Sequence, residues 1–600
     1  MLHELNTAQR AAATSRARRL LILAGPGTGK TLTLTARVEA TLERGADPES
    51  IVALSFTNRA ARELVNRLRT RAGQRAARVR AGTFHGLALR FLRRYGAAID
   101  LRGDFEVIDR ADQRSVLTSL GVLPAPPSAI AEAFSVSTLR GSPVASRFAS
   151  GGSVDELERA LAERGARAAV EDLQDVARAY ADAKERANTV DFDDLLVGFE
   201  ALLRSPRGDE LRSGVRYVLV DEYQDVSGLE ASIAELLGRR GEIAVVGDDA
   251  QAIYGFRGAL EGSIRTFAQV ADTEIVSLEE TFRSTPEILA LASFVIASDP
   301  TLIPRGLRSA RPPGQRPFLA ACATDKQEAR FVAARSFELK SNGVAFSSQA
   351  ILYRSHRQAS ALELELSRAR IPFSIRGGAG LFGSKHVKRA LSWLRLLLRP
   401  EDPDAWRRVL KDAPGIGDKR IEGAVAAAMG QAAGDARARE AVDLAFLTLA
   451  RLAEAADHGG ARAVLSELAS EEVEGSRHDD LDAIAAALGD EQNGLADASD
   501  LLALGVETSL GEQADGVTLA TIHQAKGLEW DAVFVVGLND RTFPPAFRSE
   551  VAEERRLLYV AITRARRDLA ISGRRDAPSR FFTELSARSD LVELRVVEDG

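Results

Sequence analysis

The segment AGPGTGKT (residues 24–31) follows the short apolar run RLLILAG (19–25) and leads into a helical pattern. It fits the pattern Ala/Gly-x4-Gly-Lys-Ser/Thr, with Ala24 in place of the commoner first glycine. In such a loop the backbone N–H groups face the phosphates of a nucleotide, helped by the N-terminus of the following helix. Lys30 adds a positive charge, and the Thr31 hydroxyl is a ligand for Mg²⁺. A plain glycine-rich turn is the alternative, but lysine is scarce in this chain, so we predict a nucleoside-triphosphate site.

Short apolar runs alternate with helical patterns along the rest of the chain. A first group lies at 19–25, 51–56, 79–84, 217–222 and 242–249, and a second at 350–355, 517–522 and 531–538. Buried strands separated by helices are typical of parallel, doubly wound sheets. Two stretches with few strand signals, 105–197 and 385–510, interrupt the alternation. We therefore predict an α/β protein with two parallel-sheet lobes, each interrupted by a mainly helical insertion. The proline-containing stretch 300–317 suggests an irregular connection inside the second lobe.

Composition limits the class of protein. The 600 residues are 45% hydrophobic and 27% charged, which is ordinary for a soluble globular protein. No apolar run approaches the roughly 18 residues needed to span a bilayer, and the N-terminus lacks the apolar core of a secretory signal. A single cysteine, Cys322, excludes an intramolecular disulfide and a multi-cysteine metal site. From these absences we expect a cytoplasmic protein.

The overall charge does not by itself predict nucleic-acid binding. Lys plus Arg is 79 and Asp plus Glu is 85, which gives a net charge of −6. A protein that binds nucleic acid through bulk charge is usually basic. Any such binding in this chain must come from a local groove.

The acidic pair in VLVDEYQD (218–225) fits the second half of a phosphate-hydrolysing site. Asp221 would hold Mg²⁺, and Glu222 would orient and deprotonate the attacking water. The alternative is a helix N-terminus with first-turn carboxylates. Two arginines are candidates for the cations that stabilise charge in the transition state: Arg283 in LEETFRST (278–285) and Arg564 in LLYVAITRAR (557–566).

Taken in order, these motifs resemble those of the UvrD/PcrA/Rep family of superfamily 1, group A, DNA helicases. The resemblance covers nearly the whole chain. Its motifs are LNTAQR (5–10), AGPGTGKT (24–31), FTNRAARE (56–63), GTFHGLALR (82–90), DFDDLL (191–196), VDEYQD (220–225), VVGDDAQAIYGFRGA (245–259), LEETFRST (278–285), VTLATIHQAKGLEW (517–530) and EERRLLYVAITRARR (553–567).

The resemblance implies two RecA-like P-loop lobes. Lobe 1A would comprise 1–104 and 198–278, and its helical insertion 1B would comprise 105–197. Lobe 2A would comprise 279–384 and 511–600, and its helical insertion 2B would comprise 385–510. ATP would bind between lobes 1A and 2A.

The resemblance also implies an ATP site with residues from both lobes. Gln9 would lie at the adenine edge, Gln251 would sense the γ-phosphate, and Glu529 would lie near the ribose. Phe282 stands where the family usually has an adenine-stacking Tyr, and Thr281 where it usually has Asn. From lobe 1A the expected residues are Gln9, Ala24, Gly25, Pro26, Gly27, Thr28, Gly29, Lys30, Thr31, Asp221, Glu222 and Gln251. From lobe 2A they are Phe282, Arg283, Glu529 and Arg564. The catalytic residues among them would be Lys30, Glu222, Gln251, Arg283 and Arg564, with Thr31 and Asp221 on Mg²⁺.

Single-stranded DNA would cross both lobes. Aromatic faces stack on any base, which suits movement along DNA without sequence preference. By resemblance the aromatic candidates are Phe56, Phe84, Phe192, Tyr254 and Phe256. The polar candidates, for contact with the DNA backbone or for coupling to ATP hydrolysis, are Asn58, Thr83, His85, Arg257 and Arg354. Core packing is the alternative for each phenylalanine.

The sequence thus predicts an ATP-dependent translocase on single-stranded DNA that unwinds DNA at single-strand/duplex junctions. The 3′→5′ direction is implied by the resemblance alone. One alternative is a translocase that displaces proteins without processive unwinding. Another is an ATP-binding regulatory subunit, which the presence of Lys30, Glu222 and both arginines disfavours. Protein partners and self-association stay open.

Overall fold

The structure is a computed structural model. It describes residues 4–598 apart from 57, 149–151, 378–379, 412, 418, 432–433, 472–479, 483, 486–487, 489–493, 511–515 and 547–550. The chain forms two compact units, which are described one at a time. Unit 1 comprises residues 1–289 and 293–312, and unit 2 comprises 290–292 and 313–600.

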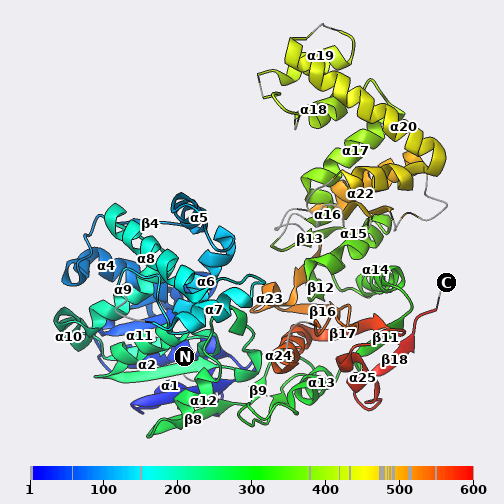
Figure 1. The fold of residues 1–600 in the computed structure, drawn as a ribbon. Coiled ribbons are helices and arrows are strands. Elements are labelled where there is room, and N and C mark those ends of the chain that lie inside the picture. The colour runs from blue at the N-terminus through cyan, green and yellow to red at the C-terminus, as the bar shows by residue number, and fades with distance from the viewer. Residues whose placement is uncertain are drawn as a thin grey trace. The chain divides into compact units, whose positions relative to one another are not determined.

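Unit 1 is built on a parallel sheet (Figure 1). Its strand order is β3-β2-β6-β7-β1-β8. Its strands are β1 (Arg19–Ala24), β2 (Ile51–Ser55), β3 (Arg80–Thr83), β6 (Tyr217–Val220), β7 (Glu242–Gly247) and β8 (Thr273–Leu278). Its helices are α1 (Thr7–Thr14), α2 (Lys30–Glu43), α3 (Asn58–Ala76), α4 (Phe84–Tyr95), α9 (Phe192–Arg204), α10 (Pro206–Ser213), α11 (Gly228–Gly238) and α12 (Ser263–Gln269), together with α13 (Pro286–Ile296) apart from its residues 290–292.

The central strands of this sheet are apolar because both of their faces are covered. In β1, Leu20 and Ile22 pack with α2 residues such as Val38, in one apolar cluster. Leu21 and Leu23 point to the opposite face, in a cluster that includes residues of α4, α9 and α11. Continuous apolar runs are the pattern expected for strands buried on two sides. The parallel arrangement brings the ends of β1, β6 and β7 to one edge of the sheet, where the motif loops follow.

The helical insertion of unit 1 has an apolar core of its own. Its helices are α5 (Arg110–Ser119), α6 (Pro127–Leu139), α7 (Val154–Ala162) and α8 (Val170–Ala187), accompanied by the short strands β4 (Glu106–Val107) and β5 (Thr189–Val190). Leu117, Phe134, Leu161, Leu173 and Tyr180 are buried together in this core. The segment predicted from its scarcity of strand signals is therefore mainly helical.

Unit 2 contains the second parallel sheet, with strand order β14-β13-β15-β12-β16-β17-β11-β18. Its strands are β11 (Phe318–Cys322), β12 (Gln349–Tyr353), β13 (Phe373–Ile375), β14 (Ser509–Leu510), β15 (Val517–Thr521), β16 (Trp530–Val535), β17 (Ala565–Arg574) and β18 (Glu593–Val596). Its helices are α14 (Asp325–Ser341), α15 (Ala359–Arg368), α16 (Gly380–Gly383), α23 (Ile522–Ala525), α24 (Val551–Ile562) and α25 (Arg580–Ser586).

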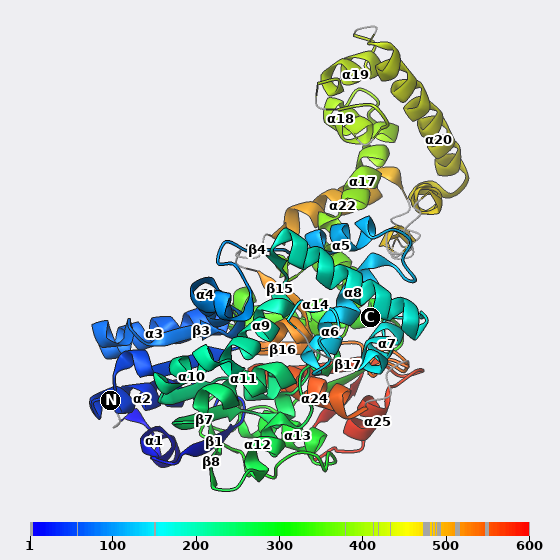
Figure 2. The same ribbon diagram turned by 60° about the vertical axis from the view of Figure 1, so that its left-hand side comes forward.

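The second insertion is also helical. It comprises α17 (Lys385–Leu398), α18 (Pro403–Lys411), α19 (Ile421–Ala428), α20 (Ala436–Ser470) and α22 (Leu495–Thr508), and α17 contacts both α20 and α22 (Figure 2). The predicted fold class, two parallel-sheet lobes with helical insertions, is confirmed. In the part of the chain that the structure describes, no helix has the length and apolar character needed to cross a membrane.

One expectation about the connections is wrong. The stretch 300–317 was expected inside the second lobe, but its residues up to 312 belong to unit 1. The short strand β10 (Arg308–Ser309) pairs there in parallel with β9 (Glu280–Thr281). The 1A, 1B, 2A and 2B boundaries given above stay predictions.

Candidate active site

The loop between β1 and α2 has the backbone that its glycines permit. Gly27 and Gly29 have φ values of 73° and 85°, in the left-handed region that glycine adopts without strain. Lys30 is the first residue of α2, and its Nζ donates to the carbonyls of Ala24 at 2.8 Å and Gly25 at 3.2 Å. The Thr28 hydroxyl also donates to Gly25 O, at 2.9 Å. Thr31 follows in the first turn of the helix, so the whole motif lies where a phosphate-binding loop requires it.

Burial sets the electrostatics of Lys30. Desolvation lowers the pKa of its ammonium group, while the negative charges of Glu222 and Asp248 oppose that shift. Asp221 and Glu222 directly follow β6, the strand that lies one place beyond β7 from β1. A partly buried cation at the head of a helix, with carboxylates nearby, is suited to a polyanionic ligand that carries its own cation.

Gln9 contacts the phosphate-binding loop itself. Its Nε2 donates to the carbonyl of Thr28 at 2.9 Å, and its Oε1 accepts from the backbone of Asn6 at 3.1 Å. A Cβ at position 29 would lie 2.7 Å from Gln9 Nε2, which is a second reason for glycine there. Both ends of the Gln9 amide are therefore engaged inside unit 1. Its expected position at the adenine edge stays a prediction.

The acidic pair after β6 is held in a defined geometry. Glu222 has φ 52°, in the left-handed region, and its N–H donates to Asp221 Oδ1 at 3.0 Å. The side-chain amide of Gln224 donates to the Glu222 carboxylate. Asp221 is 3% exposed. Burial, followed by the charge of Glu222, raises the pKa of Asp221 to about 7.

The oxygen-bearing side chains of Asp221 and Thr31 are of the kind that Mg²⁺ prefers. Asp221 provides a carboxylate, and Thr31 provides a hydroxyl beside Lys30. Among the described residues, no group of three or more His, Cys, Asp or Glu side chains could hold a metal ion. Mg²⁺ is commonly bound by one or two carboxylates together with substrate phosphates rather than by a complete protein cage. The residues present therefore fit a magnesium ion that arrives with a nucleotide.

The loop after β7 connects to this acidic pair. The N–H of Asp248 donates to Gln224 Oε1 at 3.0 Å. The side-chain amide of Gln251 donates to Asp248 Oδ2 at 2.5 Å, and Gln251 is 4% exposed. A single glutamine, Gln224, thus bonds both Glu222 and the loop that carries Gln251. The Gln224 contacts are absent from the sequence prediction, although this residue lies inside the motif VDEYQD.

The segment around Arg283 packs on the phosphate-binding loop. The Thr281 hydroxyl donates to Pro26 O at 2.7 Å, and the Phe282 N–H donates to Gly27 O at 3.1 Å. The Arg283 N–H donates to Thr281 Oγ1 at 3.3 Å, and a Cβ at Gly27 would lie 2.4 Å from Arg283 Cβ. Threonine, in place of the family's usual asparagine, is therefore hydrogen-bonded both to the phosphate-binding loop and to the backbone of Arg283. Arg283 and the half-exposed Phe282 ring lie in unit 1, and their assignment to lobe 2A stays a prediction.

Arg564 and Glu529 lie in unit 2. Arg564 follows α24, is 1% exposed, and donates from Nε to Val560 O at 2.9 Å and from Nη1 to Leu528 O at 3.1 Å. Its Nη2 donates to the Thr563 hydroxyl at 3.1 Å. Glu529 forms an ion pair with Arg566. Their roles toward a nucleotide stay predictions.

Three aromatic candidates for DNA binding lie close together, one directly after β2 and two in the motif that follows β7. The rings of Phe56 and Tyr254 stack at 5.8 Å with an interplanar angle of 26°, and Phe256 lies 6.2 Å from Tyr254. The Arg257 guanidinium lies 5.4 Å and 5.6 Å from the rings of Tyr254 and Phe256. All three rings are partly exposed. A cation beside stacked aromatic faces suits a single strand with its phosphates and bases.

The prediction for Phe84 is wrong. Its side chain is 1% exposed and packs in the apolar core beneath the sheet, so it offers no face to a base. Thr83 caps α4 by accepting the Gly86 N–H at 3.1 Å. Asn58 begins α3, and its side chain lies outside the described residues.

The next candidates meet edge to face. Phe192 is 47% exposed at the start of α9, and its ring lies 5.9 Å from that of His85. Burial lowers the pKa of His85 to about 4, so the imidazole is neutral at physiological pH. Arg354 in unit 2 forms a two-pronged pair with Glu554 of α24, with contacts of 2.8 Å from both Nε and Nη2. The Arg354 guanidinium is thus held by a carboxylate of its own unit, and its contact with DNA stays a prediction.

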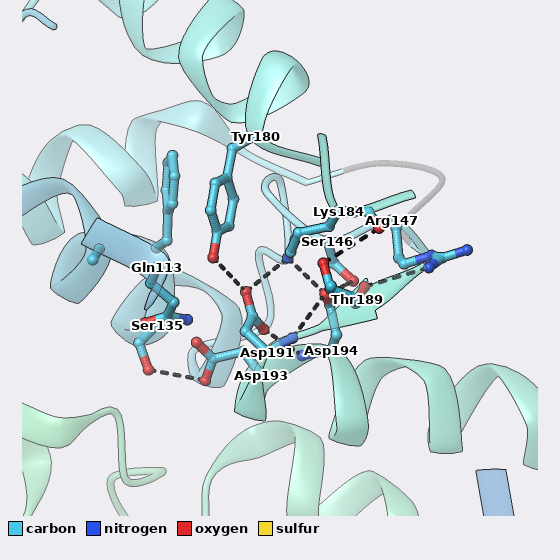
Figure 3. Close-up of polar contacts among 12 residues, drawn as sticks. Gln113, Ser135, Ser146, Arg147, Tyr180, Lys184, Thr189, Asp191, Asp193 and Asp194 are labelled. Atoms are coloured by element: carbon cyan, nitrogen blue, oxygen red, sulfur yellow. Dashed lines mark hydrogen bonds and ion pairs between the residues drawn. The ribbon is translucent and has the colours of Figure 1, made fainter. Parts of the chain in front are cut away.

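A buried ionic network holds the helix that carries Phe192 (Figure 3). Lys184 Nζ lies 2.7 Å from Asp191 Oδ2 and 2.6 Å from Asp194 Oδ2, and these side chains are at most 4% exposed. Tyr180 donates to Asp191 Oδ2 at 3.0 Å, and Ser146 donates to Asp194 Oδ1 at 2.6 Å. The network ties the helical insertion to α9. The rare lysine before DFDDLL was the sequence signal that could have revealed it.

Comparison with known proteins identifies relatives along the chain. A family model for the UvrD/REP helicase N-terminal domain matches residues 5–272. A model for the UvrD-like helicase C-terminal domain matches 276–430 and 469–576. DNA helicase II of Escherichia coli (strain K12) is 31% identical over 98% of this chain and 88% of its own length. The ATP-dependent DNA helicase PcrA of Staphylococcus aureus (strain Mu50) is 30% identical over 98% of this chain and 86% of its own length.

Proposed function

The chain belongs to the UvrD/REP family and is a DNA helicase and DNA-dependent ATPase, and on that premise we propose how its residues drive the motor. In this proposal the enzyme moves 3′→5′ on single-stranded DNA and unwinds duplex at single-strand/duplex junctions. Each step is coupled to Mg²⁺-dependent hydrolysis of ATP. The observation that carries the proposal is that the motifs of Gln9 and Arg283 pack on one phosphate-binding loop in unit 1, whose Lys30 also feels the charges of Asp221 and Glu222.

ATP would bind with its phosphates along residues 24–31. The backbone N–H groups of the loop and the N-terminus of α2 favour negative charge. Lys30 would exchange its bonds to Ala24 O and Gly25 O for bonds to phosphate oxygens. Thr31 and Asp221 would hold Mg²⁺, which neutralises phosphate charge when bound. That cation would also favour the ionised form of Asp221, against the burial that raises its pKa.

Glu222 would act as the base. Its carboxylate would take a proton from the water that attacks the γ-phosphorus, as the bond from that phosphorus to the bridging oxygen breaks. The Gln224 amide bonded to this carboxylate would orient it. Arg283, beside Gly27, would offset charge on the transferring phosphoryl group, and Arg564 is the second candidate for that task.

The motif after β7 would couple this chemistry to DNA. The Gln251 side chain is hydrogen-bonded to Asp248, and Tyr254 lies three positions after Gln251 in the sequence. A shift of Gln251 on loss of the γ-phosphate would therefore move the backbone that carries Tyr254, Phe256 and Arg257. Phe56 stacks on Tyr254 and would share the same base-binding surface. Phe192 and His85 would contribute a second surface.

The experiment compares ATP hydrolysis with and without single-stranded DNA, followed by unwinding of 3′-tailed and 5′-tailed duplexes. We expect DNA to stimulate hydrolysis and only the 3′-tailed duplex to unwind. Lys30→Ala should abolish hydrolysis, whereas Lys340→Ala, an exposed lysine in unit 2, should not. Unwinding from a 5′ tail would refute the direction. Hydrolysis with displacement of a bound protein but no unwinding would favour the translocase alternative.

A further inference from the structure

Residues 303–311, here called the strap, contact three motifs of the nucleotide site. At the phosphate-binding loop, a Cβ at Gly25 would lie 2.7 Å from Leu307 Cδ2, so the leucine is seated against that glycine. At the motif of Arg283, β10 of the strap pairs with β9: the Arg308 N–H donates to Glu279 O at 2.7 Å, and the Ala310 N–H donates to Thr281 O at 2.9 Å. The strap lies in unit 1 with all of these partners.

The third contact is ionic and reaches the motif that carries Gln251. Arg305 Nη1 lies 2.6 Å from Asp248 Oδ1, and its Nη2 lies 2.5 Å from Asp249 Oδ1. The Arg305 side chain is 5% exposed, and those of Asp248 and Asp249 are 0% and 12% exposed. The Ile303 N–H donates to the other oxygen of Asp249 at 2.7 Å. One planar guanidinium therefore spans two consecutive carboxylates, a geometry that the point charge of lysine does not reproduce.

Asp248 transmits this contact to Gln251. Its Oδ1 faces Arg305, while its Oδ2 accepts the Gln251 amide at 2.5 Å. Asp248 Oδ1 also accepts the Ala250 N–H at 3.1 Å. Arg305 and this backbone N–H together hold the carboxylate rotation that sets where the glutamine side chain lies. Buried ion pairs contribute little net stability compared with apolar residues of similar size. They do fix the geometry of the side chains that form them. The arrangement is thus better suited to positioning than to stability.

We propose that Arg305 is a positioning residue that sets Gln251 through Asp248, and that the strap holds this sensor in register with Gly25 and Arg283. The proposal rests on the proposed function, since Gln251 and Arg283 have their assigned roles in hydrolysis only if unit 1 binds a nucleoside triphosphate. Loss of Arg305 leaves the carboxylate that orients Gln251 with the Ala250 N–H but without its cation, while Lys30 and its loop stay in place. ATP binding is then retained and the hydrolytic step slows.

The test uses the full chain with Arg305→Lys and Arg305→Met, because lysine keeps the charge if methionine impairs folding. Arg308→Met is the matched control, since that strap side chain is 82% exposed and its ion pair to Glu279 is 3.6 Å long. Melting temperature, binding of a non-hydrolysable ATP analogue, and kcat and KM for ATP with single-stranded DNA are measured. We expect kcat to fall about tenfold or more in the Arg305 variants, with KM changed less than about threefold. The control should match the unaltered protein.

A double-mutant cycle distinguishes positioning from a merely structural role. If Arg305 acts through Gln251, Arg305→Lys combined with Gln251→Ala should reduce kcat no further than Gln251→Ala alone. Additive losses, or a loss of activity that only follows a loss of folded protein, would overturn the proposal. So would unchanged kcat in a folded Arg305→Lys variant. If the unaltered protein hydrolyses no ATP on DNA, the proposed function itself fails, and that result is distinct from the variant comparison.

Discussion

Replacing Lys184 by methionine would leave two buried carboxylates without their cation. Lys184 is 1% exposed and lies within 2.7 Å of both Asp191 and Asp194, whose side chains are 4% and 0% exposed. Methionine fills a similar volume but offers no charge. Breaking a buried pair by removing one partner typically costs about 3–5 kcal/mol, because the remaining charge stays desolvated. We expect a loss of this size in the stability of the insertion and of the start of α9.

The dependence on pH gives this prediction its sign. In the unaltered protein, burial alone would raise the pKa of Asp191, but Lys184 and hydrogen bonds to Tyr180 and the backbone bring it below its usual value. That carboxylate therefore stabilises the fold at neutral pH and less so as pH falls. In Lys184→Met, burial acts without the cation, so the folded state binds protons that the unfolded state releases, and stability rises as pH falls. The difference between the two proteins should shrink on acidification.

Hydrogen exchange at the amides of residues 191–196 is the appropriate assay, because a chain with several domains does not unfold in one step. Lys340→Met, at an exposed position, controls for loss of a lysine. Protection in Lys184→Met should fall at pH 7.5 and recover in part near pH 5.5. A deficit below about 1 kcal/mol, or one that does not shrink on acidification, would refute the reasoning about the buried charges.

Three further outcomes follow from single contacts. Thr281→Val removes the hydroxyl that donates to Pro26 O and accepts the Arg283 N–H, so it should lower DNA-stimulated kcat by at least about fivefold to tenfold. Thr281→Asn should keep most activity, and equal rates for the two variants would contradict this. Tyr254→Ala combined with Phe256→Ala should weaken single-strand binding by about 1–3 kcal/mol per stacked base in a titration with labelled oligonucleotide, unlike Phe337→Ala on an exposed face of α14. Burial raises the pKa of Glu363 to about 8, so the stability of the fold should fall as pH rises from about 4.5 to about 8. In thermal melts, Glu363→Gln should remove that part of the dependence of melting temperature on pH. An unchanged dependence would exclude Glu363 as its source.

Strands buried on both faces could be predicted from sequence, because a short continuous apolar run that ends in glycine, as in β1 and β7, is typical of a strand covered on two sides. Strand β8 could not, since it lies at the edge of its sheet and exposes Glu274 and Ile275. The burial of the Phe84 side chain could not be predicted either. A lone phenylalanine at the start of a helix carries no sign of which face it covers, and tertiary packing turns this one into the core.

Contacts inside a motif were similarly predictable, whereas contacts between distant segments were not. The glycine spacing in 24–31 fixes Lys30 at the head of α2, and that geometry follows from local sequence. Arg305 lies 56 positions from Asp249, in a chain rich in arginine, so no local pattern marks it. Only the folded arrangement shows that a proline-containing connection carries a cation for the motif of Gln251.

The groups assigned to hydrolysis have protein partners in this structure. Lys30 donates to the carbonyls of its own loop, Gln251 to Asp248, and Arg564 to carbonyls of unit 2. Binding of a triphosphate would therefore exchange existing hydrogen bonds for new ones, and the net free energy gained by any one group is smaller than its charge suggests. Discrimination between triphosphate and diphosphate then depends on several exchanges occurring together. The proposed strap would hold Gly25, Asp248 and Arg283 in fixed relative positions. Such exchanges would then occur together, because a γ-phosphate that binds one group would meet the others already in place.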